Sequence, residues 1–229
     1  MNSSVLLVED DVDLSYIIKF NLESAGYNVE TAYNGMESMK KIKNSKYDLI
    51  LLDVLLPDTN GTEICRHIRH EQNTPIIFVS CIDDKDIMIE ALEKGGDDYI
   101  VKPVDYAELI ARIEANIRRV KMDCRKYNIK RKLSFKQFSV DIDRRVVRNN
   151  KGEEIDLSPT EYQLLLKFIR HQGELLLYND LYSSIWESDS LGDIRTVMVH
   201  ISNLRKKIDS GKTGIIETVR GAGYIFDDK

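Results

Sequence analysis

The sequence predicts two successive domains, an α/β domain built on a parallel sheet and a smaller domain that combines short strands with three helices. Over residues 1–120, short apolar runs alternate with segments of helical apolar spacing. A segment rich in Lys and Arg follows at 121–132, and short alternating strands begin after it. These changes of pattern predict a first domain at 1–120, a charged linker at 121–132 and a second domain at 133–229.

Continuous apolar runs mark the strands of the first domain, because strands covered on both faces show no polar alternation. Between these runs, apolar residues at helical spacing predict helices, as at Leu14, Ile18 and Leu22. Five β-α units in a row imply a parallel sheet with right-handed crossovers and helices on both faces, a flavodoxin-like architecture. The predicted strands are Val5–Val8, Val29–Ala32, Leu49–Leu52, Ile76–Val79 and Tyr99–Val101, and the further helical segments are Met36–Ile42, Ile87–Leu92 and Leu109–Val120.

The second domain is predicted to begin with strands and to end with a hairpin. A helix should start at Ser158, which can cap it, with Pro159 at its first position and Glu161 completing a capping box. Strands, three helices and a terminal hairpin, in this order, describe a winged helix-turn-helix. The other elements are strands at Leu133–Phe135, Phe138–Ile142, Val146–Val147 and Ile155, helices at Asp180–Trp186 and Asp193–Ile208, and a hairpin of Ile215–Val219 and Tyr224–Phe226.

Composition is typical of a soluble globular protein, since 42% of the 229 residues are hydrophobic and 31% are charged. No apolar run approaches the ~20 residues that a membrane helix needs, and the first residues do not resemble a signal peptide. We therefore expect a cytoplasmic protein that does not enter a membrane. Residues 1–129 carry 16 basic and 23 acidic side chains, whereas 130–229 carry 17 and 15, which suggests different partners for the two halves.

The cysteines indicate neither a disulfide framework nor a zinc site. Their number is odd, and no C-x-x-C pair occurs among Cys65, Cys81 and Cys124. We expect Cys65 and Cys81 to be packed inside the first domain and Cys124 to lie in the linker.

Polar residues follow the predicted strands at the edge of the sheet where ligands of open α/β folds bind. A single acid at a strand end more often caps a helix or faces solvent, but here several groups should meet in one crevice. Clustered carboxylates need a cation between them, and oxygen ligands without His or Cys select Mg²⁺ or Mn²⁺. A carboxylate beside such a metal can attack a phosphoryl donor and form an aspartyl phosphate. The residues are Glu9, Asp10 and Asp11 after the first strand, Asp53 after the third, Ser80 at the end of the fourth and Lys102–Pro103 after the fifth.

The motifs around these residues are Val8–Asp11, Leu52–Pro57, Asn60–Gly61, Gly95–Tyr99 and Lys102–Pro103. Together with Ser80 they resemble a response-regulator receiver domain, over residues 1–120. The resemblance implies a cis bond between Lys102 and Pro103. It also implies Asp53 as the phospho-acceptor, Glu9, Asp10, Asp53 and the backbone carbonyl of Leu55 as metal ligands, Ser80 and Tyr99 as the switch pair, and Lys102 as the phosphate-binding cation.

One helix of the second domain has the features of a DNA-reading helix. Its apolar residues Val197, Ile201, Leu204 and Ile208 should pack inward, and no acid occurs between Asp193 and Asp209. A solvated basic face is the simpler interpretation. DNA reading is favoured because Val199 could contact a thymine methyl group and Asn203 could bond adenine, both from the polar face.

The segments Leu157–Tyr162, Ile194–Lys207 and Thr218–Tyr224 resemble the OmpR/PhoB family of transcription factors. The resemblance implies two protomers bound head to tail on direct repeats of double-stranded DNA, with Arg220 in the minor groove. It further implies a sensor histidine kinase as phosphodonor, RNA polymerase as a partner and a homodimer when phosphorylated. The residues it assigns to DNA binding are Arg195, Thr196, Val199, His200, Asn203, Arg205, Lys206, Lys207, Arg220 and Tyr224.

Receivers of this family pair through the fourth helix, fifth strand and fifth helix. Asp98 and Arg112 match one of the intermolecular ion pairs of that surface. Met88 stands where relatives have a base, which leaves Glu108 without its expected partner, and Glu114 replaces a residue that is often Lys. Because exposed ion pairs contribute only ~0–1 kcal/mol each, we expect a dimer that forms weakly.

Two other functions are less well supported. Phosphatases that use Asp and Mg²⁺ need a second Asp two residues after the nucleophile, and that position is Leu55. Receivers that act only as scaffolds typically lose an acid or the Lys, and this chain keeps them all. The sequence therefore predicts a phosphorylation-controlled, DNA-binding transcriptional regulator and not an enzyme.

Overall fold

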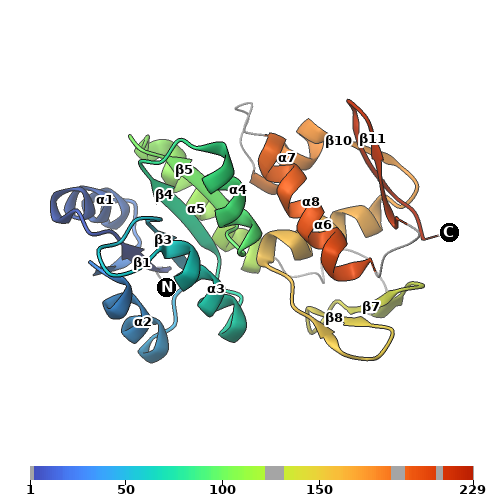
Figure 1. Cartoon of the computed structure of the whole chain (residues 1–229), viewed down its shortest axis with the longest axis horizontal. Coiled ribbons are helices and arrows are strands. Elements are labelled where there is room, and N and C mark those ends of the chain that lie inside the picture. Colours follow the sequence, from blue (N-terminus) through green and yellow to red (C-terminus); the bar gives the residue numbers. More distant parts are fainter. Residues whose placement is uncertain (1–2, 122–131, 187–193, 210–213, 229) are drawn as a thin grey trace. The chain divides into compact units, whose positions relative to one another are not determined.

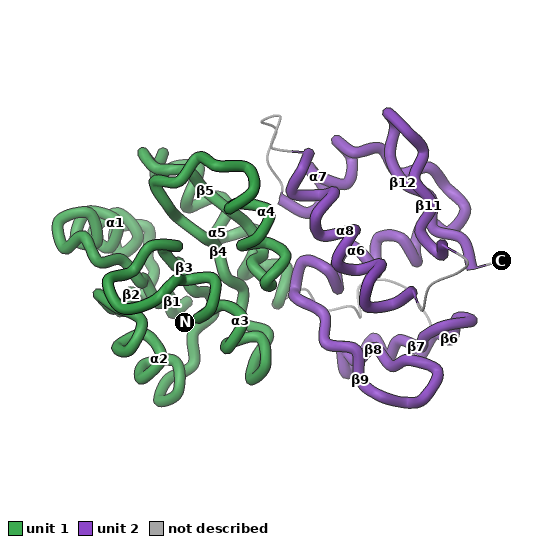
Figure 2. Tube along the Cα trace, in the orientation of Figure 1, with its two compact units in different colours: residues 1–120 green, residues 121–229 purple. Residues whose placement is uncertain are grey.

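A computed structural model describes residues 3–121, 132–186, 194–209 and 214–228. The chain forms two compact units, residues 1–120 and residues 121–229, drawn in two colours in Figure 2. Most of the predicted linker, residues 122–131, lies outside the described residues. Among the described residues, no helix is long and apolar enough to cross a membrane.

The first unit contains a five-stranded parallel sheet in the order β2-β1-β3-β4-β5 (Figure 1). This order and direction confirm the flavodoxin-like architecture that the sequence predicts. The strands are β1 (Ser4–Val8), β2 (Asn28–Ala32), β3 (Leu49–Leu52), β4 (Ile76–Ser80) and β5 (Asp98–Val101).

Five helices connect and flank these strands. Four of them begin at Asp or Asn side chains, namely Asp11, Asn34, Asn60 and Asp84, which accept hydrogen bonds from the backbone of the first turn. No helix is predicted from the sequence between the third and fourth strands, although Ile64, Cys65 and Ile68 have helical spacing and are buried in the third helix. They are α1 (Val12–Ser24), α2 (Gly35–Asn44), α3 (Gly61–Glu71), α4 (Lys85–Glu93) and α5 (Tyr106–Lys121).

Both faces of the parallel sheet are buried. On one face, Leu7 and Leu51 belong to a core that includes Ile18 of α1 and Ile113 of α5. Side chains alternate along a strand, so Leu6, Ile50 and Phe78 point to the opposite face, and each is 0% exposed. The strand interiors are therefore apolar, and the polar chemistry of this unit is left to the strand ends and loops.

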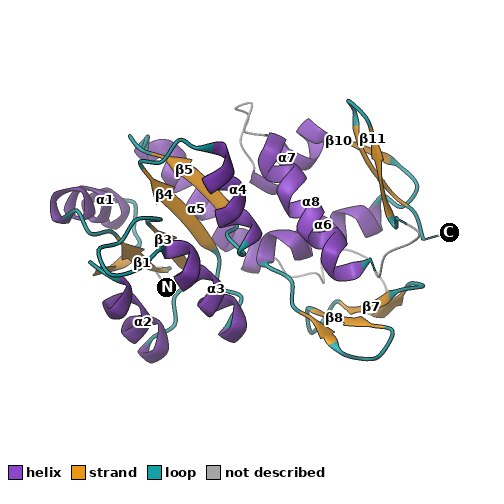
Figure 3. Cartoon of the chain, viewed as in Figure 1, coloured by secondary structure: helices purple, strands orange, loops and turns teal. Residues whose placement is uncertain are grey.

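The second unit holds two antiparallel sheets (Figure 3). The first has the order β6-β7-β8-β9, and the second has the order β10-β12-β11. Strand β10 is not predicted from the sequence, because a run of three apolar residues is too short to indicate a strand. The strands are β6 (Lys132–Ser134), β7 (Phe138–Asp141), β8 (Val146–Asn149), β9 (Glu154–Ile155), β10 (Leu175–Leu177), β11 (Ile216–Val219) and β12 (Gly223–Phe226).

Three helices complete the second unit: α6 (Pro159–Arg170), α7 (Tyr178–Trp186) and α8 (Ile194–Ile208). The predicted capping box at the start of α6 is confirmed, with Ser158 accepting from the Glu161 backbone and Glu161 accepting from the Ser158 backbone. The four inward residues predicted for α8 are at most 3% exposed and belong to the core of this unit.

Candidate acidic site and nucleic-acid interface

The acidic residues gather where the strand order changes direction. The connection from β1 leads to β2 on one side, and the connection from β3 leads to β4 on the other. The two outgoing chains diverge at the carboxyl ends of β1 and β3, which creates the crevice where open α/β sheets bind ligands. Glu9 and Asp10 follow β1, and Asp53 follows β3, with the Asp53 backbone N–H donating to Val8 at 3.0 Å.

Glu9, Asp10 and Asp53 each direct a carboxylate oxygen to one place. These oxygens lie within 4.8 Å of one another. Among the described residues, these three acids are the group that could hold a metal ion. Glu9 and Asp53 are 2% and 6% exposed, whereas Asp10 is exposed. Three carboxylates without His or Cys fit a hard cation such as Mg²⁺ or Mn²⁺, and Asp10 leaves the cluster open to solvent on one side.

Lys102 is the cation that the chain itself supplies to this cluster. Its Nζ lies 2.6 Å from Oε2 of Glu9 and 2.5 Å from Oδ2 of Asp53. Burial favours a lower pKa for Lys102, but its hydrogen bonds to Asp53 and Glu9 outweigh burial and raise it. Burial also raises the pKa of Glu9, although Lys102 opposes this shift. The Lys102–Pro103 peptide bond is cis, as predicted.

The predicted switch pair lies in the next two strands. Ser80 ends β4 and is fully buried, and its carbonyl accepts from the Lys102 backbone at 2.8 Å. Tyr99 on β5 is buried, and its hydroxyl donates to the Ile82 carbonyl at 2.8 Å. Burial raises the pKa of Tyr99. The structure thus links β5 to the loop after β4 through this phenol.

The loop after Asp53 is held by contacts that the sequence analysis did not identify. The carboxylate of Asp58 accepts from the backbone of Gly35 at 2.7 Å and of Met36 at 2.9 Å, which fixes the loop to the start of α2. These hydrogen bonds lower the pKa of Asp58. At Gly61 a side chain would collide with the Asp53 carbonyl. The only sequence signal for Asp58 is an acid close to the Asn60 helix cap.

Asp11 has a structural role within this region. Its side chain accepts from the backbone N–H groups of Asp13 and Leu14, both at 3.0 Å, and so caps α1. Asp11 therefore has the helix-capping role that a single acid at a strand end usually has. Its role differs from that of its acidic neighbours Glu9 and Asp10. Among the described residues, the group of acids that could hold a metal includes Glu9 and Asp10 but not Asp11.

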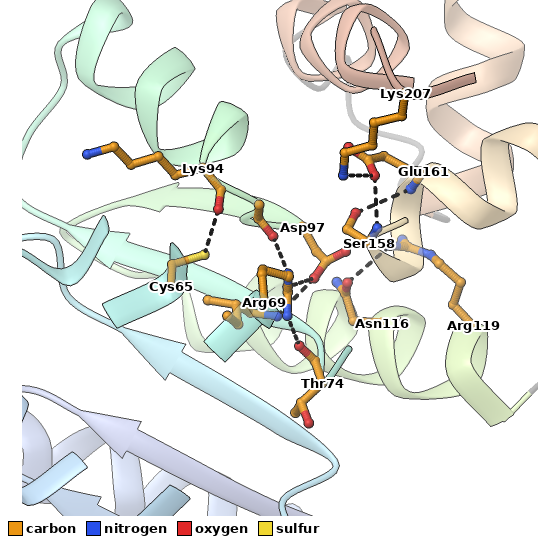
Figure 4. A network of polar contacts seen from close by, with 12 residues as sticks. Cys65, Arg69, Thr74, Lys94, Asp97, Asn116, Arg119, Ser158, Glu161 and Lys207 are labelled. Carbon is orange, nitrogen blue, oxygen red and sulfur yellow. Dashed lines mark hydrogen bonds and ion pairs between the residues drawn. The ribbon is translucent and has the colours of Figure 1, made fainter. Parts of the chain in front are cut away.

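The cysteine prediction is half right for the two thiols that the structure describes. Cys65 is buried, its thiol contacts the Lys94 carbonyl at 3.6 Å, and burial raises its pKa to about 11 (Figure 4). Cys81 is exposed, so the prediction that it is packed is wrong. It directly follows β4, where the chain leaves the covered part of the sheet. Cys124 lies outside the described residues.

Arg69 supports the far end of the sheet. Its guanidinium donates to the Thr74 and Gly95 carbonyls and to the Asp97 carboxylate, the last at 2.7 Å (Figure 4). These bonds fix the entrances to β4 and β5. They lie at the amino ends of the strands, whereas the acidic site lies at the carboxyl ends, so we assign this network to the fold.

The residues predicted to pair between receivers are paired within one chain. Arg112 donates to Asp98 at 2.9 Å and contacts Glu108 at 2.7 Å. Asp98 is 1% exposed, and Glu108 has an in-chain partner that the sequence analysis did not assign to it. Burial raises the pKa of Asp98, although Arg112 opposes this shift.

The predicted DNA-reading face of α8 is not uniformly exposed. His200 is buried, and its ring centroid lies 5.6 Å from that of Trp186. Thr196, Val199 and Asn203 are also buried, with 5%, 8% and 5% exposure. Contact of these three side chains with bases would therefore require that they become accessible.

Three consecutive basic residues of α8 make different contacts. The Nη2 atom of Arg205 donates to the Ile216 carbonyl at 2.5 Å and to the Thr218 hydroxyl at 2.9 Å. Lys206 is exposed. Lys207 donates to the buried Glu161 carboxylate at 2.7 Å (Figure 4).

The terminal hairpin of β11 and β12 forms the predicted wing. Arg220 lies in the turn between these strands, next to Gly221, whose φ is 74°. This positive φ suits glycine, which has no side chain to clash with the backbone. Tyr224 is buried and packs between the Arg205 guanidinium, at 5.1 Å, and the Tyr178 ring, at 5.4 Å.

Comparison with known proteins agrees with this architecture. Residues 5–114 match the model of the response regulator receiver domain, and residues 152–226 match the model "Transcriptional regulatory protein, C terminal". Response regulator ArlR of Staphylococcus saprophyticus is 38% identical, over 97% of this chain and 98% of its own length. PhoP of Bacillus subtilis, an alkaline phosphatase synthesis transcriptional regulatory protein, is 36% identical, over 100% of this chain and 98% of its own length.

Among solved structures, the response regulator DrrB of Thermotoga maritima, described as an OmpR/PhoB homologue, has a TM-score of 0.52 and 27% identity, over 99% of this chain and 100% of its own. The two domain matches together give the order receiver domain, then transcriptional regulatory domain. ArlR is named a response regulator and PhoP a transcriptional regulatory protein, which agrees with the prediction that this chain is not an enzyme. The chain belongs to the OmpR/PhoB family of response regulators, two-component transcriptional regulators in which phosphorylation of a receiver domain controls a DNA-binding domain.

Proposed function

We propose that Asp53 accepts a phosphoryl group from a sensor histidine kinase and that the adduct controls promoter binding by the second unit. One observation carries the first part: Glu9, Asp10 and Asp53 meet Lys102 at the point where the strand order changes direction. This arrangement offers a nucleophilic carboxylate, oxygen ligands for a divalent cation and a fixed ammonium within one crevice.

In the proposed reaction a carboxylate oxygen of Asp53 forms a bond to phosphorus. The bond from phosphorus to the donor breaks, and its electron pair leaves with the donor. A bound Mg²⁺ or Mn²⁺, held by Glu9, Asp10, Asp53 and the Leu55 carbonyl, would supply positive charge to the phosphoryl oxygens. Lys102, already 2.5 Å from Asp53, supplies further positive charge at the same place.

Ser80 and Tyr99 are proposed to report the adduct to the rest of the unit. Ser80 ends the strand next to Asp53, so its hydroxyl can donate to a phosphoryl oxygen. Such a bond would shift the loop after β4, to which Tyr99 is bonded through Ile82. The consequence would be a changed surface at α4, β5 and α5.

Phosphotransfer from acetyl phosphate or phosphoramidate, followed by intact mass, tests this function. A single stable adduct of one phosphoryl group supports the switch. Steady release of phosphate from outside substrates would instead indicate an enzyme, and complete absence of an adduct would indicate a scaffold.

DNA binding is proposed to use two kinds of contact. Lys206 is exposed on α8 and is proposed to contact a phosphate. Its replacement by Ala should weaken binding to all sequences alike and reduce the slope of log affinity against log salt by about one unit. Filter binding or anisotropy over a salt series measures this slope, and a slope equal to that of the parent would exclude the phosphate contact.

Asn203 is proposed to read a base once it becomes accessible. Asn203→Ala should relax the preference at one position of the site, by about 1–3 kcal/mol. Selection from a random DNA pool gives the site preference of each variant. If the preferences of parent and variant are the same, Asn203 does not read a base.

We also propose that phosphorylated chains associate weakly through α4, β5 and α5, with DNA supplying much of the energy of assembly on direct repeats. Asp98 and Arg112 already pair within the chain, so pairing between chains would exchange one ion pair for another and gain little. Sedimentation of the chain with beryllofluoride, a phosphoryl mimic, should show weak association that Arg112→Glu reduces. A tight dimer without the mimic, or association unchanged by a folded Arg112→Glu variant, would contradict this proposal.

Regulation of promoters implies action in the cytoplasm together with RNA polymerase, which we propose as a further partner. Transcription in vitro from a selected site, with purified polymerase and with or without the phosphoryl donor, tests this partnership. Equal transcript levels with and without the phosphoryl donor, measured when the DNA site is saturated with protein, would argue against this partnership.

A further inference from the structure

Arg205 joins the recognition helix α8 to the wing. Its guanidinium donates through Nη2 to the Ile216 carbonyl and the Thr218 hydroxyl of β11, and it lies 5.1 Å from the centroid of the Tyr224 ring on β12. A cation over an aromatic ring is attracted by the ring, so one side chain holds both strands of the hairpin. Its Nε atom is also buried.

The contact falls close to the tip of the wing. Thr218 and Tyr224 are directly opposite each other in the hairpin, and the next pair, Val219 and Gly223, is followed by the turn that holds Arg220. A guanidinium fixed at this level therefore restrains the direction in which the turn points relative to α8.

The other edge of the hairpin is held independently. β12 pairs with β10 over three residue pairs, and at Gly223 any side chain would collide with the Leu176 backbone. The three-stranded sheet therefore does not depend on Arg205, and a variant at this position should retain it.

We propose that Arg205 is a positioning residue that couples base reading by α8 to minor-groove contact by Arg220. The inference rests on the proposed DNA binding, and it gives Arg205 a role other than the direct DNA contact that the sequence resemblance implies. Two elements reading two grooves act together only if their separation is fixed. The minor groove is only about 6 Å wide, so a small displacement of the wing removes Arg220 from it.

A double-mutant cycle with Arg205→Met and Arg220→Ala tests the coupling. Binding of the full chain, activated with beryllofluoride, is measured on a site selected from a random pool. Each single variant should lower affinity about tenfold, and the double variant should be no more than about twofold weaker than either single one. A double variant about a hundredfold weaker than the parent would show independent effects and overturn the proposal.

Lys206→Met is the matched control, because Lys206 follows Arg205 on α8 and is exposed. Its effect should multiply with that of Arg220→Ala. If Arg205→Met merely lowered the folded fraction, its effect on affinity would also multiply with the effect of Arg220→Ala. An effect that does not multiply therefore indicates positioning and not instability. Thr218→Val, which removes an acceptor on the wing, should weaken DNA binding less than Arg205→Met does. The double variant of Thr218→Val and Arg205→Met should bind as weakly as Arg205→Met alone.

Arg205→Lys distinguishes positioning from a phosphate contact. Lys keeps the charge but lacks the planar fork that donates and stacks at once, so it should bind as weakly as the Met variant. Affinity within about twofold of the parent would show that charge alone suffices and would overturn the proposal. If Arg220→Ala has no effect in the parent, the wing contact and this inference both fail. If the parent selects no site, the proposed DNA binding fails.

Discussion

Asp53→Asn is expected to abolish the phosphoryl adduct while leaving the fold intact. An amide is a far weaker nucleophile than a carboxylate, and loss of a nucleophile typically lowers a rate by about 10³-fold or more. Lys102 donates to Oδ2 of Asp53 at 2.5 Å and the Leu55 backbone donates to Oδ1 at 3.1 Å, so the single amide oxygen of Asn can keep one of these two bonds. Lys102 also keeps its bond to Glu9. Intact mass after treatment with acetyl phosphate measures the adduct.

Asp11→Asn provides the control for this experiment. Asp11 lies two residues after Glu9. It caps α1 and is not part of the cluster of Glu9, Asp10 and Asp53. Asn is an equally good cap, so this variant should label like the parent. Full labelling of Asp53→Asn, or equal loss of labelling in both variants, would refute Asp53 as the acceptor.

Much of the first unit could be predicted because the signals are local. Leu49–Leu52 is a continuous apolar run, and a strand covered on both faces requires one. Strand ends then follow from the sequence, and the topology of parallel sheets brings those ends to one edge. The positions of Asp10 and Asp53 were therefore predictable from the fold class, before any distance was known.

The contacts that hold the acidic site were not predictable in the same way. Asp58 bonds the start of α2, more than twenty positions earlier in the sequence, and no local pattern specifies that distant pairing. Lys102 was expected near phosphate, but its simultaneous bonds to Glu9 and Asp53 depend on side-chain conformations that only the folded site selects.

In the second unit, periodicity predicted which side of α8 packs inward but not what the other side contacts. Arg205, Lys206 and Lys207 are similar in charge and adjacent in sequence. Their different surroundings arise from the fold: Arg205 contacts the wing, Lys207 contacts Glu161 of the α6 capping box, and Lys206 is exposed. Helical spacing contains no information about these partners.

Removal of the divalent cation is expected to stop phosphorylation, and Asp10→Ala is expected to weaken both metal binding and labelling. Three carboxylates face one ammonium in the crevice, so an incoming phosphoryl group would add negative charge that Lys102 alone cannot balance. Loss of an outer-shell group typically costs about 10–100-fold in metal affinity, and loss of a direct ligand should cost at least as much.

Calorimetric titration with Mg²⁺ and labelling in excess EDTA measure these two effects. Asp13→Ala is the control, because it removes a nearby acid of the first turn of α1 that lies outside the described group of acids that could hold a metal. It should change both quantities little, since an exposed charge outside the cluster interacts with the metal only through screened solvent. Undiminished labelling in EDTA would refute the metal requirement. Equal loss of affinity in the two variants would show that Asp10 acts through general charge and is not a ligand.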